Sequence, residues 1–412
     1  MLRKTLASMV ALSMMVGLAA CGSSAGGGSG ATTAATTAAA TEAPAPAGEA
    51  PAGASPTFKI GYNYFGSASY TLMTLANNSG DTLKALDVEY IASDDKFSLE
   101  QLVTDVENMI AAGCDGLVLW LPTDTLYATV TEMCKEAQVP FVLNDKLPMD
   151  ESLIAQISEN PYFVGAFGVK NAQYGVALAN YVLEQGWKAC FITSSNVGDV
   201  SDTERMDAFK GIFEAAGGKV FTELHASSSD EALPQIEDAL TAYGEQIDFI
   251  YGVGGDFGNA ACSALENYKG GESGLKVITT GIDQGTLDNF DAGTIAMVNG
   301  DYFVNGIVSV IAMVNYLEGN HLVDASGKSP WIYNTASIDI NADTNAVFRK
   351  VFTQRLCYSD DELRNMTYAY NAGFKYADLE AAIMNYSFSD RVAAAVKAGV
   401  ITADEAAGAG VK

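Results

Sequence analysis

The chain has 412 residues, of which 49% are hydrophobic and 18% are charged, and its formal net charge is -27 at pH 7. So large a negative charge argues against binding to nucleic acid and against adhesion to anionic lipid surfaces. After a low-complexity N-terminal stretch about 355 residues remain, which is more than one typical domain holds, so we expect two lobes.

The N-terminus has the features of an export signal. Arg3 and Lys4 precede an apolar stretch at 6–16, and Leu18-Ala19-Ala20-Cys21 follows. Small residues before a cleavage point are typical of secretory signals. A cysteine directly after them resembles the bacterial lipobox, which implies a signal peptide at 1–20 and lipidation of Cys21. The alternative is an ordinary signal peptide with a chance cysteine.

Residues 22–57 consist almost entirely of Gly, Ala, Ser, Thr and Pro. This composition is typical of a disordered linker, because it offers too little apolar side chain to offset the entropy of ordering. No other apolar run is long enough for a transmembrane helix. We therefore expect a folded body that is lipid-anchored on the extracytoplasmic face of the cell membrane.

Short runs rich in β-branched and aromatic residues alternate with helical patterns through the body. The predicted strands are 58–65, 88–93, 116–121, 140–144, 163–167, 188–193, 219–225, 249–253, 276–281 and 295–298. Such alternation is typical of α/β proteins with parallel sheets, and about ten strand–helix units fit two doubly wound lobes better than one sheet. A closed barrel of eight units is the alternative.

The last part of the chain, 357–412, is predicted to be a helical C-terminal extension with helices at 361–377 and 391–398. If Cys21 carries lipid, the remaining cysteines are Cys114, Cys134, Cys190, Cys262 and Cys357. An odd number without a C-x-x-C pair argues against a disulfide framework, even in an exported protein.

Seven short segments occur in an order that resembles one protein family over about 58–352. They are 59–61 (K-I-G), 113–118 (G-C-D-G-L-V), 139–146 (V-P-F-V-L-N-D-K), 171–175 (N-A-Q-Y-G), Arg205 with 209–211 (F-K-G), 255–256 (G-D) and 281–283 (G-I-D). Most lie at strand ends or in the following loops, where open α/β sheets bind ligands. The order resembles that of the type 1 periplasmic binding proteins of the ribose/galactose type.

This resemblance implies two doubly wound parallel-sheet lobes joined by a three-segment hinge. We expect the first lobe at 58–162 plus 285–324, and the second at 163–284 plus 331–352. The resemblance also implies an extracytoplasmic solute-binding protein that captures a sugar or sugar-like molecule by hinge closure. The protein would then deliver this ligand to an ABC importer.

The same resemblance implies a set of ligand-binding residues, which are Tyr70, Asp145, Lys146, Asn171, Arg205, Asp256 and Asp283. Trp120 is a further candidate for stacking on a ligand. Carboxylates accept hydrogen bonds from hydroxyls, cations and amides donate, and an aromatic ring covers the apolar face of a sugar. The structural alternatives are helix capping for Asp145 and Asp283, a surface position for Arg205 and a core position for Tyr70.

The chain departs from the sugar-binding pattern at several positions. Lys146 stands where relatives have arginine, Leu121 and Gly255 stand where they often have asparagine, and no glutamine occurs near Asn299. These differences indicate a rebuilt pocket, for which ribose itself is not the expected ligand.

No catalytic constellation is evident in the sequence. Its two histidines, His225 and His321, have no metal-ligand partner at a useful spacing, and Ser194-Ser195 lies outside any G-x-S-x-G segment. We expect no enzyme, no cofactor and no metal. The expected partners of a monomer are a monosaccharide or related polyol and the ABC permease subunits, without nucleic acid. The alternative is a receptor lipoprotein that binds a sugar, autoinducer or nucleoside and signals through a membrane sensor.

Overall fold

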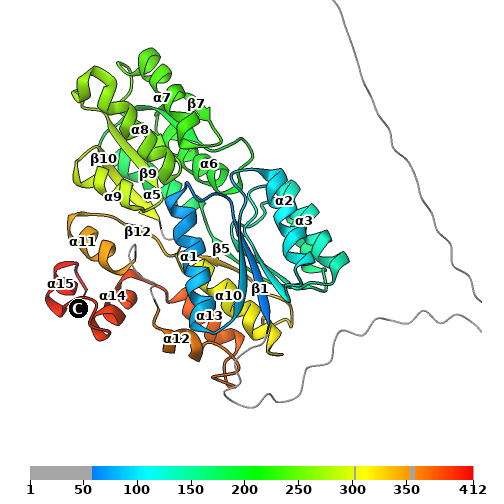
Figure 1. Cartoon of the computed structure of the whole chain (residues 1–412). Helices are drawn as coiled ribbons and strands as arrows, with labels where there is room; N and C mark the ends of the chain where they lie inside the picture. Colours follow the sequence, from blue (N-terminus) through cyan, green and yellow to red (C-terminus); the bar gives the residue numbers. More distant parts are fainter. Residues whose placement is uncertain (1–57, 301–302, 353–357, 412) are drawn as a thin grey trace, which may run out of the picture. The chain divides into compact units, whose positions relative to one another are not determined.

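The computed structural model describes residues 58–300, 303–352 and 358–411 (Figure 1). The signal peptide, Cys21 and the linker predicted for 1–57 lie outside the described residues, as does Cys357. Within the described ranges no helix is long and apolar enough to cross a membrane. Four cysteines are buried as free thiols, at Cys114, Cys134, Cys190 and Cys262.

The first of two six-stranded sheets has the order β11-β5-β4-β3-β1-β2, and all of its pairings are parallel. Its strands are β1 (Lys59–Tyr64), β2 (Glu89–Asp94), β3 (Gly116–Leu119), β4 (Phe141–Asp145), β5 (Phe163–Val169) and β11 (Trp331–Asn334). Every residue of β3, β4 and β5 is buried, as expected for parallel strands covered by helices on both faces.

The helices of the first sheet form two groups. On one face, α1 (Tyr70–Ala85) packs beside α10 (Phe303–Leu317), which also contacts β3, β4 and β5. On the other face, α2 (Leu99–Ala111), α3 (Asp124–Ala137) and α4 (Glu151–Ser158) pack in succession (Figure 1). We call this sheet with its helices lobe 1.

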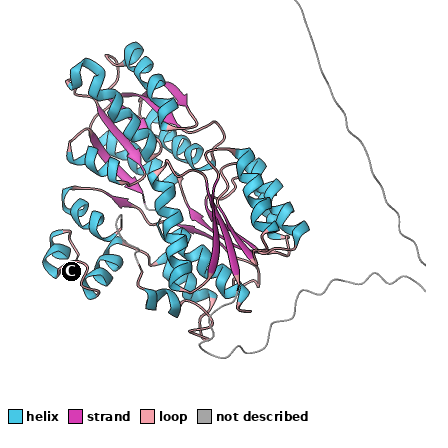
Figure 2. Ribbon diagram, viewed as in Figure 1, coloured by secondary structure: helices cyan, strands magenta, loops and turns pink. Residues whose placement is uncertain are grey.

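The second sheet has the order β12-β10-β9-β8-β6-β7 and is parallel except for β12, which pairs antiparallel with β10 (Figure 2). Its strands are β6 (Ala189–Ser194), β7 (Lys219–His225), β8 (Phe249–Gly252), β9 (Lys276–Thr280), β10 (Ile295–Gly300) and β12 (Ile338–Asp339). The covering helices are α5 (Ala172–Glu184) with α6 (Val200–Ala215), and α7 (Ser229–Tyr243) with α8 (Gly255–Asn267) and α9 (Gln284–Asp291). We call this part lobe 2.

Each of the ten predicted strands is present, and two parallel-sheet lobes replace the alternative of a closed barrel. The chain passes between the two sheets three times, after β5, after β10 and after β11, so the predicted three connections are confirmed. The strands β11 and β12 were not predicted as strands, because each is short and flanked by loops.

The predicted boundaries between the lobes are wrong at three strands. The strand β5 pairs with β4, with Leu143 opposite Ala166, so lobe 1 continues beyond 162 to Val169. The strand β10 pairs with β9 and belongs to lobe 2, whereas 285–324 was expected in lobe 1. The strand β11 pairs with β5 in lobe 1 and not in lobe 2. Central parallel strands share one apolar composition, so their sequence does not reveal which sheet they join.

The C-terminal extension is helical, as predicted, but its first helix is wrong. The segment predicted as one helix at 361–377 contains α12 (Asp360–Asn365), a series of turns and the start of α13 (Tyr376–Met384). In the turns, the Asn371 side chain accepts a hydrogen bond from the backbone N–H of Gly373 at 3.1 Å. Such local side-chain bonds compete with helix formation. Two further helices follow, α14 (Phe388–Lys397) and α15 (Ala403–Gly408).

The extension packs against elements of both lobes. In lobe 1, Asn315 of α10 donates to a backbone carbonyl of the extension at 2.8 Å, and α13 contacts α10 and β11. The helices α14 and α15 pack on α11 (Ala342–Val351), and Arg349 of α11 pairs with Asp291 of α9 in lobe 2 at 3.0 Å. Arg391 of α14 in turn pairs with Glu362 of α12 at 3.2 Å. The extension is therefore continuous with the main hydrophobic core.

Two substitutions in α13 test this integration. Leu379 is 0% exposed and Met384 is 55% exposed. Leu379→Ala should lower the free energy of unfolding by about 2–5 kcal/mol through lost burial and a cavity, while Met384→Ala should change it by less than about 0.5 kcal/mol. Denaturant unfolding followed by circular dichroism measures both. A main transition that Leu379→Ala leaves in place would mean that the extension unfolds independently of the lobes.

Candidate ligand-binding site

A cavity of about 310 Å³ is lined by both lobes. Its walls come from the loops that leave the carboxyl ends of β1, β2, β3 and β4 in lobe 1 and of β6, β7, β8 and β9 in lobe 2. This edge of a parallel sheet is where open α/β folds bind ligands, because the connecting loops and helix N-termini converge there.

Five of the predicted ligand-binding residues line this cavity, namely Trp120, Asp145, Lys146, Arg205 and Asp256. Two others, Asn171 and Asp283, are not among the described lining residues. Tyr70 begins α1 at the cavity edge, but its side chain lies outside the described part of the chain. The strand-end motifs thus predicted four of the charged residues that line the cavity, and they did not indicate Asp199, Asp202, Asp230 or the serines of the wall.

Asp145 ends β4 with its carboxylate buried inside lobe 1. Its Oδ2 accepts from the Trp120 indole at 3.2 Å, and its Oδ1 accepts from the Asn305 amide at 3.1 Å. Burial raises the pKa of Asp145, and these hydrogen bonds and the charges of Lys146 and Arg205 oppose the rise. Asp145 does not cap the next helix, since Asp150 caps α4.

The backbone at Asp145 is in the left-handed region, with φ of 67°. The N–H of Lys146 donates to the carbonyl of Asn144 at 2.8 Å, which closes a tight turn. A non-glycine residue in this region carries strain of about 1–3 kcal/mol, and such strain concentrates at functional sites. The turn directs Asp145 and Lys146 to neighbouring points of one cavity wall.

Arg205 is buried in lobe 2 and is held in place by polar groups from three elements. Its Nε and Nη2 donate to Asn171 Oδ1 at 3.1 and 2.7 Å, and its Nη1 donates to the Val253 carbonyl at 3.3 Å. Nη1 also lies 3.4 Å from Asp202. The surface position considered for Arg205 is therefore wrong, because the side chain is only 6% exposed.

The segment 171–175 positions Arg205 rather than lining the cavity. Asn171 fixes the guanidinium as described, and Gly175 on the next turn lies against the backbone of α6. A Cβ at Gly175 would stand 2.1 Å from the carbonyl oxygen of Arg205. Glycine is therefore required for the close packing of α5 on α6.

Lys146 connects the lobes at one side of the cavity. Its Nζ pairs with Asp199, which also accepts from the N–H of Asp202 as the N-cap of α6. The ammonium lies 4.7 Å from the centre of the Trp120 ring. The predicted role in ligand binding is thus accompanied by an ion pair between the lobes, which the sequence did not indicate.

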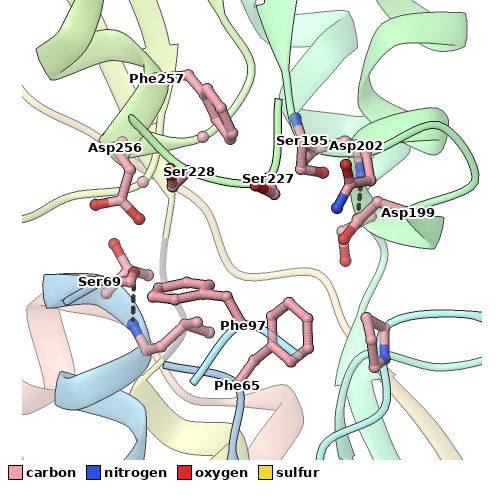
Figure 3. A pocket seen from close by; sticks show the side chains of 18 of the residues that line it. Phe65, Ser69, Phe97, Ser195, Asp199, Asp202, Ser227, Ser228, Asp256 and Phe257 are labelled. Atoms are coloured by element: carbon pink, nitrogen blue, oxygen red, sulfur yellow. Dashed lines mark hydrogen bonds between the residues drawn. The ribbon is translucent and has the colours of Figure 1, made fainter. Parts of the chain in front are cut away.

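Aromatic rings form the wall of lobe 1, and sequence reasoning missed two of them. Phe65 stacks on Trp120 with ring centroids 5.4 Å apart, and Phe97 meets Phe65 edge-on at 5.6 Å (Figure 3). Phe65 directly follows β1, a position that could have been noticed as an aromatic at a strand end.

Phe97 gave no such signal in the sequence. It reaches the cavity through a tight turn in which Lys96 and Phe97 both have positive φ, of 53° and 57°, and Ser98 N–H donates to the Asp95 carbonyl at 3.0 Å. Non-glycine residues adopt this conformation only when their surroundings hold them there.

A buried polar network behind the aromatic wall supports this turn. The Asn63 amide donates to Asp95 Oδ2 at 2.7 Å and to the Trp120 carbonyl at 2.9 Å, and Asn63 Oδ1 accepts from Trp120 N–H at 2.9 Å. Burial, opposed by the Asn63 bond, raises the pKa of Asp95 to about 8. One asparagine therefore links the turn that carries Phe97 to the strand end that carries Trp120.

The opposite wall, in lobe 2, carries Asp256, Phe257 and two serines, Ser227 and Ser228 (Figure 3). Burial raises the pKa of Asp256 to about 6, a hydrogen bond from Ser69 lowers it, and the charges of Asp283 and Asp202 raise it further. Ser69 is the N-cap of α1 in lobe 1, and its Oγ accepts from the N–H of Leu72 at 3.3 Å.

Asp283 lies behind the cavity wall and takes the structural role that was its alternative. Its carboxylate accepts from the N–H of Thr286 at 2.8 Å and completes a capping box at the start of α9. The Asn259 amide donates to it at 3.2 Å. A Cβ at Gly255 would stand 2.7 Å from Asp283 Oδ2, so the glycine at that position accommodates this carboxylate.

The described residues include no group of three or more His, Cys, Asp and Glu that could hold a metal ion. His225 contacts Ser194 Oγ at 3.0 Å and the Ser195 carbonyl at 2.9 Å. His321 lies 3.2 Å from Ser329 Oγ. These contacts hold the rings of both histidines in position within the fold.

Solved structures with the same fold include periplasmic binding proteins of ABC transporters. One, of an arabinose transporter from Shewanella sp. ANA-3, has 18% identity and a TM-score of 0.58, over 70% of this chain and 93% of that chain. The myo-inositol binding protein of Caulobacter has 16% identity and a TM-score of 0.60, over 73% and 98%. A periplasmic ribose ABC transporter protein from Conexibacter woesei DSM 14684 has 19% identity and a TM-score of 0.57, over 72% and 96%.

At these identities the likeness shows the shared fold, and no curated protein matches the chain by sequence. The periplasmic binding protein domain, as a sequence family, matches residues 64–321. This match covers more than half of the chain and includes every lobe 1 and lobe 2 residue that lines the cavity. The chain belongs to the periplasmic binding protein domain family.

Proposed function

We propose that the protein is the extracytoplasmic solute-binding component of an ABC importer and that it captures a monosaccharide or related polyol. One observation carries the proposal: Asp145 and Arg205 reach one cavity from opposite lobes, beside the aromatic wall of Phe65, Phe97 and Trp120. Carboxylate and guanidinium suit the hydroxyls of a sugar, and the rings suit its C–H face.

The ligands named for solved structures with the same fold support this class of ligand. The names of the solved relatives include arabinose, ribose and myo-inositol, which are compact polyhydroxylated molecules. A cavity of about 310 Å³ is at the small end of ligand pockets, which suits one ring better than an oligosaccharide.

The first test combines a ligand screen with two variants. A thermal-shift screen over pentoses, hexoses, inositols and their amino derivatives should find a ligand, which adds roughly 2.7 kcal/mol of stability at a hundred times its Kd. Asp145→Asn and Arg205→Lys should then each weaken binding about tenfold or more, because each removes a desolvated charged hydrogen bond.

Two exposed residues provide matched controls, Asp238 in α7 and Lys188 before β6. Asp238→Asn and Lys188→Ala should bind the ligand as the unmodified protein does. If Asp145→Asn and Arg205→Lys also bind normally, the assignment of these two residues is incorrect. Titration calorimetry gives the affinities.

Closure of the two lobes on the ligand is the second expectation. The lobes are linked by polar contacts such as the Lys146–Asp199 ion pair and the bond from the Val200 N–H to the Pro122 carbonyl at 3.5 Å, so the empty protein should populate more open forms. Small-angle scattering should show a smaller radius of gyration after saturation with the ligand found in the screen. An unchanged radius at saturation would argue against closure.

Attachment through Cys21 is the third expectation. Cys21→Ser in the full-length chain should move the protein from the membrane fraction to the soluble extracytoplasmic fraction, because the substituted residue can no longer carry lipid. Fractionation followed by immunoblotting measures this, and circular dichroism confirms that the variant is folded. Retention of the variant at the membrane would contradict a lipid anchor at this position.

A further inference from the structure

The cavity carries an excess of negative charge. Its described lining includes five carboxylates, at Asp145, Asp199, Asp202, Asp230 and Asp256, and two cationic side chains, Lys146 and Arg205. A hydroxyl group that donates to a carboxylate brings no positive charge. A ligand with hydroxyls alone would therefore leave the excess negative charge of the lining uncompensated.

Both cations of the lining are already engaged with protein groups. Lys146 pairs with Asp199, and Arg205 lies 3.4 Å from Asp202 and is bonded to Asn171. The field of these two cations also reaches Asp145, whose pKa they lower. Among the described residues, the positive charge that offsets the carboxylates therefore lies on the Asp145 side of the cavity.

Asp256 is in a different situation. Ser69 lowers its pKa, whereas the charged groups that act on it, Asp283 and Asp202, are both acidic and raise its pKa. Asp256 lies in the first turn of α8, where the helix dipole stabilises an anion by about 0.3–1 kcal/mol. This stabilisation is smaller than the cost of burying the charge, because the pKa of Asp256 remains raised to about 6. At neutral pH the carboxylate is thus mostly ionised, and no cationic side chain is among the described groups that act on it.

Two aromatic rings line the same cavity as this carboxylate. Phe257 lies on the lobe 2 side and Phe97 on the lobe 1 side, and the Asp256 carboxylate points toward Ser69 of lobe 1 (Figure 3). A cation bound at the carboxylate gains from its charge, and gains about 0.5–2 kcal/mol more for each ring face that it contacts.

We propose, building on the proposed function, that the ligand is an aminated polyhydroxyl compound, such as an amino sugar, and that Asp256 binds its protonated amine. The hydroxyls of the same ligand lie toward Asp145 and Arg205 on the other side of the cavity. The ammonium supplies the counter-charge that none of the described side chains acting on Asp256 provides.

Matched ligand pairs test the proposal. The probes are D-glucosamine with D-glucose, D-galactosamine with D-galactose and D-mannosamine with D-mannose, together with the N-acetyl forms, which keep the size but lose the charge. In at least one set the amino sugar should bind about tenfold or more tightly than its neutral parent and its N-acetyl form. Calorimetry at pH 7 measures this.

Asp256→Asn separates charge from shape. The variant should lose at least about tenfold in affinity for the amino sugar and should bind the neutral parent no worse than the unmodified protein. Asp238→Asn, an exposed carboxylate replaced in the same way, should leave both affinities unchanged. The empty Asp256→Asn protein should melt at the same or a higher temperature, because a partly buried charge with acidic neighbours has been removed, and this excludes misfolding as the cause.

The outcomes distinguish this inference from the function on which it rests. If a neutral sugar or polyol binds as well as its amino counterpart, the inference is overturned and sugar capture stands. If an amino sugar binds but Asp256→Asn does not weaken it, the assignment to Asp256 is overturned. If no member of any set binds at millimolar concentration, both the inference and sugar capture are overturned.

Discussion

The common direction of the parallel strands is the constraint on which the site depends. Eight strands, four in each lobe, end at the cavity, and the helices that follow begin there. The helix starts bring Ser69, Asp199 and Asp256 to the cavity as caps or first-turn residues. A reversed strand would present its amino end instead and would remove both a loop and a helix N-terminus from the wall.

The charged groups of the site are held by polar partners, which orient the charged side chains more than they stabilise the fold. Asn171 takes two hydrogen bonds from Arg205, and Trp120 and Asn305 each donate to Asp145. Burying charges is costly unless they are paired, so a fold keeps them where a ligand completes the compensation. At Asp256, the charged groups that act on the carboxylate are acidic, which is why the proposed ammonium is assigned to this position.

Strain in the backbone lies at the same edge of the sheets. Asp145 and Phe97 both have positive φ, and each presents a side chain to the cavity. The network of Asn63, Asp95 and Trp120 stabilises the turn of Phe97 from behind. The rings of lobe 1 are therefore placed before any ligand arrives, which reduces the entropy lost on binding.

The sequence predicted those features that depend on a few neighbouring residues. The ten strands, the alternation with helices and the strand-end positions of Trp120, Asp145, Lys146 and Asp256 follow from local periodicity and from motifs. Asp283 shows the limit of this approach, because a carboxylate at a strand end suits a ligand contact and a helix cap equally well. In the structure, Asp283 forms a capping box with Thr286 and so caps α9.

What only the tertiary structure decided involves residues far apart in the chain. The assignment of β11 to lobe 1 depends on its pairing with β5, across more than 160 residues. The contact of Asn305 with Asp145 and the ion pair of Lys146 with Asp199 likewise join distant segments. Local sequence sets burial and periodicity, whereas the choice of partner depends on the energies of contacts that exist only after the chain has folded.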